Sequence, residues 1–272
     1  MSTASTTELA RPRTGAPPVS TPASRMKALA RAELTLLGRN KSAMFTALVL
    51  PAMLTFSMST AVDGMDLKES GLTVGTVLLP GSLGYVLLFA VYSALTGVFV
   101  VRREELVLKR LRTGELRDLE ILAGASLPAV LLALVQCVLL AAGCTVVMDV
   151  AAPRAVWLAV AGLLLGALLM GVLAAATAAF TRSAEAAQIS VMPMLLVSMV
   201  GSGMTVPQDL MPDAMASVCE LLPLSPAITL IRGGWTGALD SGEVLGRLAT
   251  AVAWTLLGVF AVRRRFRWEP RR

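Results

Sequence analysis

The sequence predicts an all-α integral membrane protein with six transmembrane helices. The first observation behind this is composition: of 272 residues, 56% are hydrophobic and only 15% are charged. A typical soluble domain is roughly 45–50% apolar and about 25% charged. The mean hydropathy of the chain is +0.72. This apolar excess is too large for one soluble core, so we expect the chain to lie in a lipid bilayer.

The second observation is a set of six apolar runs. An α-helix rises about 1.5 Å per residue, so about 20 apolar residues cross a hydrocarbon core of about 30 Å. The six predicted spans are Ala43–Val62, Thr76–Val101, Ile121–Met148, Ala155–Phe180, Ala187–Val206 and Val244–Val262. An even number of spans places both termini on the same side of the membrane.

The distribution of lysine and arginine predicts which side that is. Twenty of the 24 basic residues fall before the first span, after the second, after the fourth or after the sixth. The remaining four are Lys68, Arg154, Arg232 and Arg247. Because cytoplasmic segments carry the basic excess, we expect a cell-membrane protein with cytoplasmic termini. The net charge of +6 then divides into +11 inside and −5 outside. This asymmetry favours anionic lipid headgroups over nucleic acid.

Outside the spans, the chain divides by composition. The first 24 residues are rich in Ser, Thr, Ala and Pro and lack apolar periodicity, which indicates a disordered tail. A long polar stretch precedes the first apolar run, so we do not expect a cleavable signal peptide. Apolar residues at three- and four-residue spacing then predict an amphipathic helix on the membrane surface. The predicted units are a cytoplasmic tail at 1–24, an interfacial helix at 25–42, a six-span domain at 43–262 and a basic cytoplasmic tail at 263–272.

Missing residue types exclude several kinds of chemistry. The chain has no histidine, and its three cysteines, Cys137, Cys144 and Cys219, are too scattered for a thiolate metal site. The strongest polar groups in the spans are Gln136 and Gln188, which argues against an ion-coupled transporter or a membrane enzyme. None of the four lysines follows a glycine, as a phosphate-binding loop requires. We therefore expect no catalytic, cofactor or metal residues, and energy for any transport from a separate ATPase.

The charged segment Arg102–Glu120 lies between the second and third spans. It is expected to extend the second span as a helix and to break at Thr113-Gly114 into two short helices. For any single residue, a solvated helix face is the plainer interpretation. Taken as a unit, the segment is the only sizeable folded element that we expect on the cytoplasmic side. A partner ATPase would therefore dock there. The residues predicted to couple to it are Arg103, Glu104, Leu108, Lys109, Arg110, Leu111 and Arg112.

The stretch between the fifth and sixth spans is predicted to re-enter the membrane from outside. Ala214–Leu222 is apolar and helix-permissive but too short to span. Prolines on both sides of it fix bends in the chain. An ordinary extracellular loop is the alternative. The prolines assigned to this region are Pro207, Pro212, Pro223 and Pro226.

Two helix faces within the spans are distinctive. Met192, Leu196 and Met199 lie near one face of the fifth span, and flexible thioethers suit a path for varied hydrophobic cargo. Packed or lipid-facing methionine is the plainer interpretation. In the fourth span, Gly162 and Gly166 form a small-xxx-small pair that predicts close helix packing, within the chain or between copies.

Together these features resemble the type-2 ATP-binding-cassette (ABC) permease family, and within it the membrane subunits of actinobacterial daunorubicin-resistance-type antibiotic exporters. The resemblance covers Arg25–Arg267 and is strongest in Glu104–Gly124 and in the series Ser202-Gly203, Pro207, Met211-Pro212, Leu222-Pro223-Leu224 and Pro226. In relatives the coupling segment often runs into a Thr-Pro turn, whereas this chain has Thr113-Gly114.

The resemblance implies an interfacial connecting helix at Arg25–Gly38, a coupling helix within Arg102–Glu120 and outer re-entrant helices before the last span. It also implies a homodimer of permeases seated on separate nucleotide-binding subunits that bind ATP and Mg. The expected function is the permease subunit of an exporter for a small amphipathic or hydrophobic compound, such as an antibiotic or a lipid. Two alternatives stay open: a non-transporting membrane scaffold, and an exporter of polysaccharide or lipid. Short loops leave no room for a carbohydrate-binding domain.

Overall fold

The structure is a computed structural model that describes residues 74–113, 117–147, 150–205 and 211–266. It also describes Gln208, Trp268, residues 53–57 and the single positions 31, 35, 41 and 49. Over this part the chain forms helices and no strands. The helices are α3 (Val74–Val86), η1 (Leu87–Ser93), α4 (Ala94–Glu104), α5 (Val107–Arg112), α6 (Asp118–Val147), α7 (Val156–Phe180), α8 (Ala184–Ser190), α9 (Met192–Gly201), α10 (Asp213–Glu220), α11 (Ser225–Thr236) and α12 (Ser241–Arg265).

Five helices in the described part are long and apolar enough to cross a membrane. They correspond to the second to sixth predicted spans: Val77–Glu104, Asp118–Val146, Val156–Phe180, Ala184–Gly201 and Ser241–Arg265. The bent pair α10–α11 passes the same test as a sixth. The prediction of a multi-span, all-helical membrane protein is therefore confirmed.

The predicted N-terminal units lie largely outside the described residues. Of the predicted first span, Ala43–Val62, the structure describes residue 49 and residues 53–57, all of them helical. Within the predicted interfacial helix, Arg31, Thr35 and Lys41 are described, and each is helical and exposed. The predicted tail at 1–24 lies outside the described part altogether, and so do residues 267 and 269–272 of the basic tail at 263–272, whose first three residues belong to α12.

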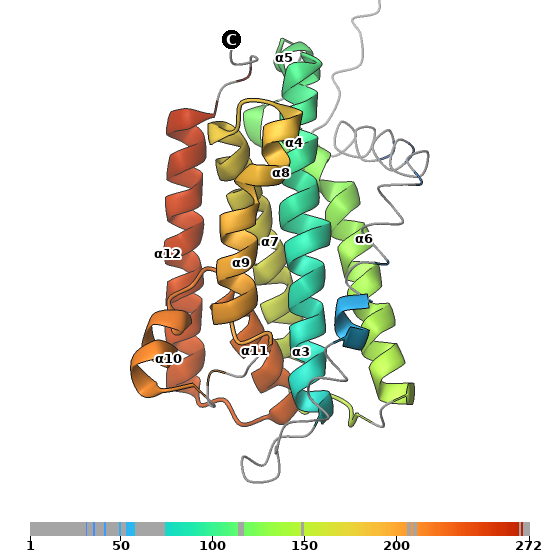
Figure 1. Cartoon of the computed structure of the whole chain (residues 1–272), viewed down its shortest axis with the longest axis vertical. Helices are drawn as coiled ribbons and strands as arrows, with labels where there is room; N and C mark the ends of the chain where they lie inside the picture. The colour runs from blue at the N-terminus through green and yellow to red at the C-terminus, as the bar shows by residue number, and fades with distance from the viewer. Residues whose placement is uncertain are drawn as a thin grey trace, which may run out of the picture.

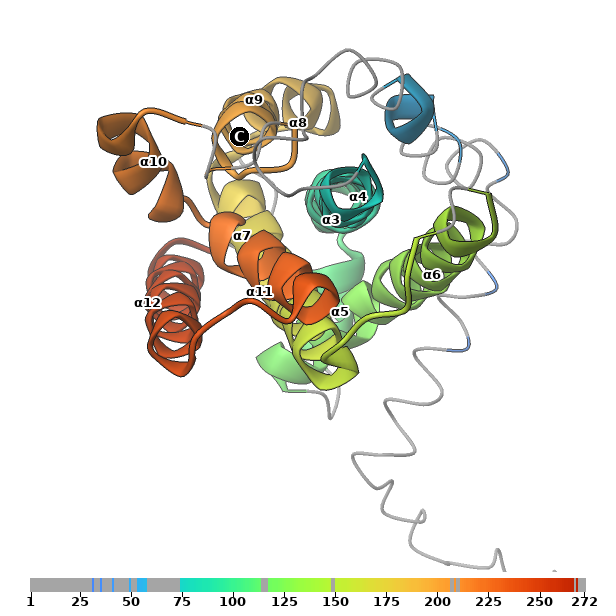
Figure 2. The same ribbon diagram turned by 90° about the horizontal axis from the view of Figure 1, so that it is seen from below.

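The long helix α3–η1–α4 lies at the centre of the bundle, surrounded by α6, α7, α11 and α8–α9, whereas α10 and α12 lie at the periphery (Figure 2). In its most apolar stretch, 67% of the central helix is buried, against 11% for α12. Exposed apolar side chains on α12 include Val252, Leu256 and Phe260. A helix that is apolar on its outer surface is matched to lipid rather than to water.

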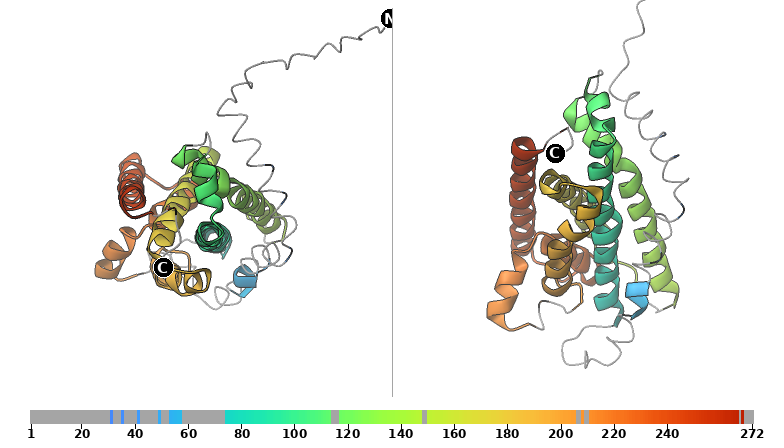
Figure 3. Two further views of the ribbon diagram at one scale, coloured as in Figure 1. Left: turned by 90° about the horizontal axis from the view of Figure 1, so that it is seen from above. Right: turned by 45° about the horizontal axis from the view of Figure 1, so that its top comes forward.

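The short helices lie at opposite ends of the bundle. The short helix α5 and the end of α12 lie at one end, which we call the α5 end, and α10 lies at the other, the α10 end (Figures 1 and 3). Helix α12 begins with a capping box, in which Asp240 accepts from Gly242 N at 3.1 Å and Glu243 accepts from Asp240 N at 3.4 Å. It ends with three arginines. Acidic residues at the first turn and basic residues at the last both complement the helix dipole.

Glycines allow α7 and α11 to cross at close range. A Cβ atom on Gly162 would lie 3.0 Å from Ile231 N and 3.1 Å from Ala227 O, and one on Gly234 would lie 2.5 Å from Ala159 N. Because backbone atoms cannot move aside as a flexible side chain can, a larger residue at either position would push the two helices apart. The glycine pair predicted in the fourth span therefore packs on α11 of the same chain.

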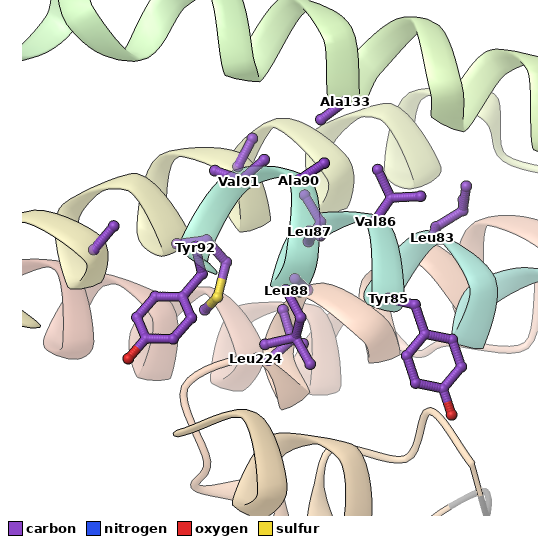
Figure 4. Close-up of a cluster of buried hydrophobic side chains, with 14 of the residues drawn as sticks. Leu83, Tyr85, Val86, Leu87, Leu88, Ala90, Val91, Tyr92, Ala133 and Leu224 are labelled. Atoms are coloured by element: carbon purple, nitrogen blue, oxygen red, sulfur yellow. The ribbon is translucent and has the colours of Figure 1, made fainter. Parts of the chain in front are cut away.

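The middle of the central helix is π-helical over Leu87–Ser93. Its side chains are buried on several sides: Leu88 lies beside Leu224 of the segment before α11, while Ala90 faces Ala133 of α6 (Figure 4). Such π-helical insertions inside α-helices are rare and frequently lie at functional positions. The core of the described part is thus built around a helix that changes its winding halfway along.

Candidate functional site

The α5 end carries the loop that was predicted to couple to an ATPase. As predicted, the second span continues as a helix, here to Glu104, and α5 ends at Arg112. The expected break at Thr113-Gly114 is preceded by another at Leu106, whose φ of 61° is left-handed. Gly114 lies outside the described residues. Leu106 N donates to Arg103 O at 3.1 Å and Arg110 N to Leu106 O at 3.0 Å, so one helix closes and the next opens at this residue.

Two of the seven predicted coupling residues point inward. Leu108 and Arg103 both have 0% of their surface exposed. These two side chains therefore do not lie on the outer surface of the loop. Leu108 is the apolar anchor of α5, and Arg103 reaches the carbonyl groups of another helix.

The remaining members of the predicted set form the outer side of the loop. Glu104, Lys109, Arg110 and Arg112 are exposed, and Leu111 is half-buried. Arg112 Nε lies 3.1 Å from an oxygen of Asp118, at the start of α6. Its guanidinium also lies 5.1 Å from the ring centroid of Trp268, within range of a cation–π contact. The exposed part of α5 is therefore basic.

Arg103 binds the carboxyl end of α7. Its Nη1 donates to Ala178 O at 2.8 Å, and its Nη2 donates to Thr181 O at 2.6 Å and more weakly to Arg182 O at 3.4 Å. The last carbonyls of a helix have no partner within the helix and carry the negative end of its dipole. A guanidinium with five fixed donors satisfies several of them at once. This buried cation would otherwise be costly.

Glu104 binds the next helix along the chain. One of its carboxylate oxygens accepts from Ala184 N, the first residue of α8, at 3.3 Å. Ser183 caps the same helix by accepting from Ala186 N at 3.2 Å. Consecutive residues at the end of α4 therefore bond to the end of α7 and to the start of α8.

The α10 end holds a buried cluster of polar side chains, which we call the α10-end cluster: Tyr85, Thr205, Gln208, Ser225 and Arg232. Tyr85 and Thr205 share a hydrogen bond of 3.0 Å between their hydroxyl groups. Gln208 Nε2 donates to Gly201 O and to Ser225 Oγ, at 3.2 Å each.

Arg232 donates from Nη2 to Gly203 O. The sequence had placed this arginine with the outer-loop charges, but it is 9% exposed and lies within α11. The carbonyls that it and Gln208 bind lie just at and beyond the end of α9. The α10-end cluster therefore ties the end of the fifth span to α11.

The region predicted to re-enter the membrane forms the helix pair α10–α11, bent by 104°. Pro212 precedes α10, Pro223 is buried in the bend and Pro226 lies in the first turn of α11, whereas Pro207 lies outside the described residues. Helix α10 is held to α12 by an ion pair of 2.8 Å between Glu220 and Arg247.

The predicted cargo face lies on α9. Met192 and Leu196 are 48% and 61% exposed, and Met199 is half-buried. The opposite side of the helix carries Leu195 and Ser198, both buried against the core. Met192 and Leu196 therefore lie on the outer side of the fifth span, whereas Met199 packs against the core.

Within the described part, no group of three or more Cys, Asp or Glu side chains is placed to hold a metal ion, and the three cysteines are free and buried. The features that the sequence did not indicate are the inward bonds of Arg103, the burial of Arg232 and the left-handed Leu106. All three depend on partners far away in the sequence or on backbone angles that leucine rarely adopts.

The ABC-2 type transporter family model matches residues 24–235. Because this is most of the chain, the protein belongs to the ABC-2 type transporter family. It is a transmembrane permease of an ABC exporter, a transport component that is not itself catalytic, and such permeases normally work with an ATP-binding subunit. The match runs through α3 to α11 and stops before α12. No curated protein matches the chain significantly.

Proposed function

We propose that the chain is the permease subunit of an exporter for a small amphipathic or hydrophobic compound, and that a separate subunit binds ATP with Mg and hydrolyses it. The observation that carries the proposal is the family match over residues 24–235. Two further facts support a separate ATPase. The sequence contains no phosphate-binding loop, and the described part is all helical, without the strands of a nucleotide-binding fold.

The ATPase docks at the α5 end in this proposal. Helix α5 projects beyond the ends of the neighbouring spans (Figure 1). Its exposed side chains Lys109, Arg110 and Arg112 offer positive charge to a partner, and basic residues favour the cytoplasmic side of a membrane protein. Fewer residues then contact the ATPase than the seven that the sequence predicted, because Arg103 and Leu108 face inward.

The cargo path runs along α9 and is completed by a second copy of the chain, as a homodimer. Support comes from the partly exposed, flexible side chains of Met192, Leu196 and Met199, which suit cargo of varied shape. The bent pair α10–α11 is the re-entrant gate at the outer surface. In this mechanism, ATP-driven closure of the two ATPase subunits moves α5, the spans shift, and a path between the two copies opens outward.

The decisive experiment reconstitutes the permease with its ATP-binding subunit in lipid vesicles. ATP-dependent movement of a fluorescent anthracycline is measured, with an ATPase whose phosphate-loop lysine is replaced as the control. We expect transport only with the active ATPase. Hydrolysis without movement of an anthracycline or of a fluorescent lipid would contradict the proposed cargo. No association with any ATP-binding subunit would support a scaffold instead.

Two further measurements test the assembly. Mass photometry of the complex in nanodiscs is expected to give two permeases and two ATPase subunits, and a single permease would contradict the homodimer. A reporter protein fused after Arg272 is expected to be active in the cytoplasm only, in agreement with the excess of basic residues on that side. Activity outside would invert the orientation.

A further inference from the structure

The end of α4 is bonded to both sides of the turn between α7 and α8. We call residues 103–106 the α4–α5 corner and residues 181–183 the α7–α8 turn. On one side of the turn, the Arg103 guanidinium binds Ala178 O and Thr181 O at 2.8 and 2.6 Å. On the other side, the Glu104 carboxylate accepts from Ala184 N at 3.3 Å.

The charges of these two residues match the helix ends that they meet. A cation is stabilised at the carboxyl end of α7, where unpaired carbonyls point outward, and an anion at the amino end of α8. Exchanging the two charges would reverse both interactions. The two charges therefore determine which residue of α4 binds which helix end: Arg103 binds α7 and Glu104 binds α8.

A third contact joins η1 to the same turn of α7. Three turns before Arg103, the Tyr92 hydroxyl bonds to Thr177 Oγ1 at 3.1 Å. Thr177 O in turn accepts from the Thr181 hydroxyl at 2.9 Å. Tyr92 and Arg103 therefore both bond to the last turn of α7, whereas Glu104 bonds to α8, so the central helix cannot move away from these helix ends without breaking at least one contact.

The corner itself has a defined shape. Leu106 adopts φ 61° and ψ 12°, a left-handed conformation that is unfavourable for a non-glycine residue and persists only where the surroundings enforce it. Beyond it, the buried Leu108 anchors α5. Helix α5 therefore leaves α4 in a fixed direction rather than as a flexible extension.

We propose that Arg103 and Glu104 are positioning residues that join the α4–α5 corner and the α7–α8 turn into one rigid unit. When α5 moves, the same displacement reaches α8 and so the fifth span of the same chain. This rests on the proposed function, in which α5 receives the motion of the ATPase. Neither residue touches ATP or cargo in this role; they act through the two helix ends that they hold.

The first test measures transport per ATP hydrolysed in the reconstituted complex. Arg103→Gln is expected to lower this ratio by roughly tenfold, the factor that corresponds to losing one charged hydrogen bond, while hydrolysis continues because α5 still docks. Arg103→Lys keeps the charge and is expected to recover part of the ratio. The matched control is Arg264→Gln, which removes an exposed arginine at the same end of the bundle.

The second test needs the permease alone, in nanodiscs, and follows hydrogen–deuterium exchange of peptides covering residues 181–190. Glu104→Ala removes the acceptor of Ala184 N and is expected to raise exchange there severalfold. Glu104→Gln retains a carbonyl acceptor but loses the charge, so its exchange is expected to lie between those of wild type and Glu104→Ala. Because Glu104 is exposed, neither substitution disturbs the core, so both variants are expected to fold.

The outcomes separate this inference from the proposed function. A transport ratio in Arg103→Gln equal to that of Arg264→Gln would overturn the inference, and so would equal exchange at 181–190 in Glu104→Ala and wild type. If the wild-type complex transports nothing, the proposed function fails, while the exchange experiment still decides whether the two elements are joined. A lower ratio in Arg103→Gln together with faster exchange in Glu104→Ala is the result that we expect.

Discussion

Helices α9 and α11 are separated in the chain only by the short helix α10, yet they are held in the bundle in different ways. Helix α11 crosses α7 through glycines, with backbone against backbone, and Ala155 N donates to Gly234 O at 2.9 Å. The fifth span, α8–α9, buries Leu195 and Ser198, but its described hydrogen bonds to other elements lie at its two ends, at Glu104 and at the α10-end cluster.

This difference indicates which helices keep their relative position and which span can bend. Backbone contact leaves no side chain to rotate or repack, so the α7–α11 crossing behaves as a rigid joint. A span fastened by polar bonds at its ends can bend between them, and α8–α9 already breaks at Val191 in front of Pro193. We therefore expect α7 and α11 to move together as one unit, and α8–α9 to be the span that bends.

The largest expected effect comes from breaking the rigid joint. In Gly234→Ala the new Cβ would lie 2.5 Å from Ala159 N, a distance at which the helices must separate. Overpacking of this kind costs roughly 3 kcal/mol, and the apparent Tm in nanodiscs is expected to fall by about 6–12 °C. Gly246→Ala, at a position with open space on α12, is the control and should not lower the Tm. An unchanged Tm in Gly234→Ala would refute the close crossing.

Next in size is the removal of a tie at the α10 end. Arg232→Met keeps a long side chain but loses the charged hydrogen bond to Gly203 O, which we expect to cost about 2 kcal/mol. Because this bond holds the fifth span to α11, exchange of peptides covering 192–205 should rise more than exchange within α7. A uniform rise over the whole chain would indicate general destabilisation and not a specific tie.

A smaller effect is expected at Gly162. A Cβ added at Gly162 would lie 2.9–3.1 Å from its nearest atoms, so Gly162→Ala forces a smaller shift than Gly234→Ala. We expect it to lower the free energy of unfolding by about 1 kcal/mol. Gly171, on the same helix, would place its Cβ 3.8 Å from Leu95, an ordinary contact. Gly171→Ala is therefore expected to be neutral or slightly stabilising. Thermal unfolding that ranks the two variants in the opposite order would contradict this assignment.

The smallest effect on stability is expected on the exposed side of α9. Leu196 is 61% exposed, so Leu196→Ala should change the free energy of unfolding by less than about 0.5 kcal/mol. Its effect on transport is expected to depend on the cargo, with the apparent KM shifted differently for a bulky anthracycline and a smaller dye. If transport of both compounds is unchanged, this face contacts lipid and not cargo.

Spans were predictable because membrane burial is a property of a continuous stretch of sequence. The fourth predicted span, Ala155–Phe180, and α7 differ by one residue, and the sixth extends only a few residues beyond Val244–Val262 at each end. The bent pair before the last span was also predictable, because a short apolar segment between prolines can neither span the membrane nor remain in water. Length and breakers determined these features, and both are local.

The roles of single side chains were not predictable in the same way. Arg103 was placed among exposed basic residues, since nothing within a turn of it in the sequence indicates that Ala178 and Thr181 are its partners. Arg232 was treated as a loop charge for the same reason. The left-handed Leu106 had no glycine or asparagine to mark it. A side chain of one helix that binds the end of another helix can be identified only from tertiary contacts. Composition and spacing hold no information about such contacts.

The π-helical segment Leu87–Ser93 sets the rotational phase between the two halves of the central helix. The π-helical segment takes up one extra residue, and an α-helix advances about 100° per residue, so winding the same residues as a regular α-helix would turn α4 by about that angle relative to α3. Arg103 would then leave the α7 carbonyls while Tyr85 kept its place beside Thr205. Seven residues in the middle of the bundle thus set the alignment between polar contacts at its opposite ends.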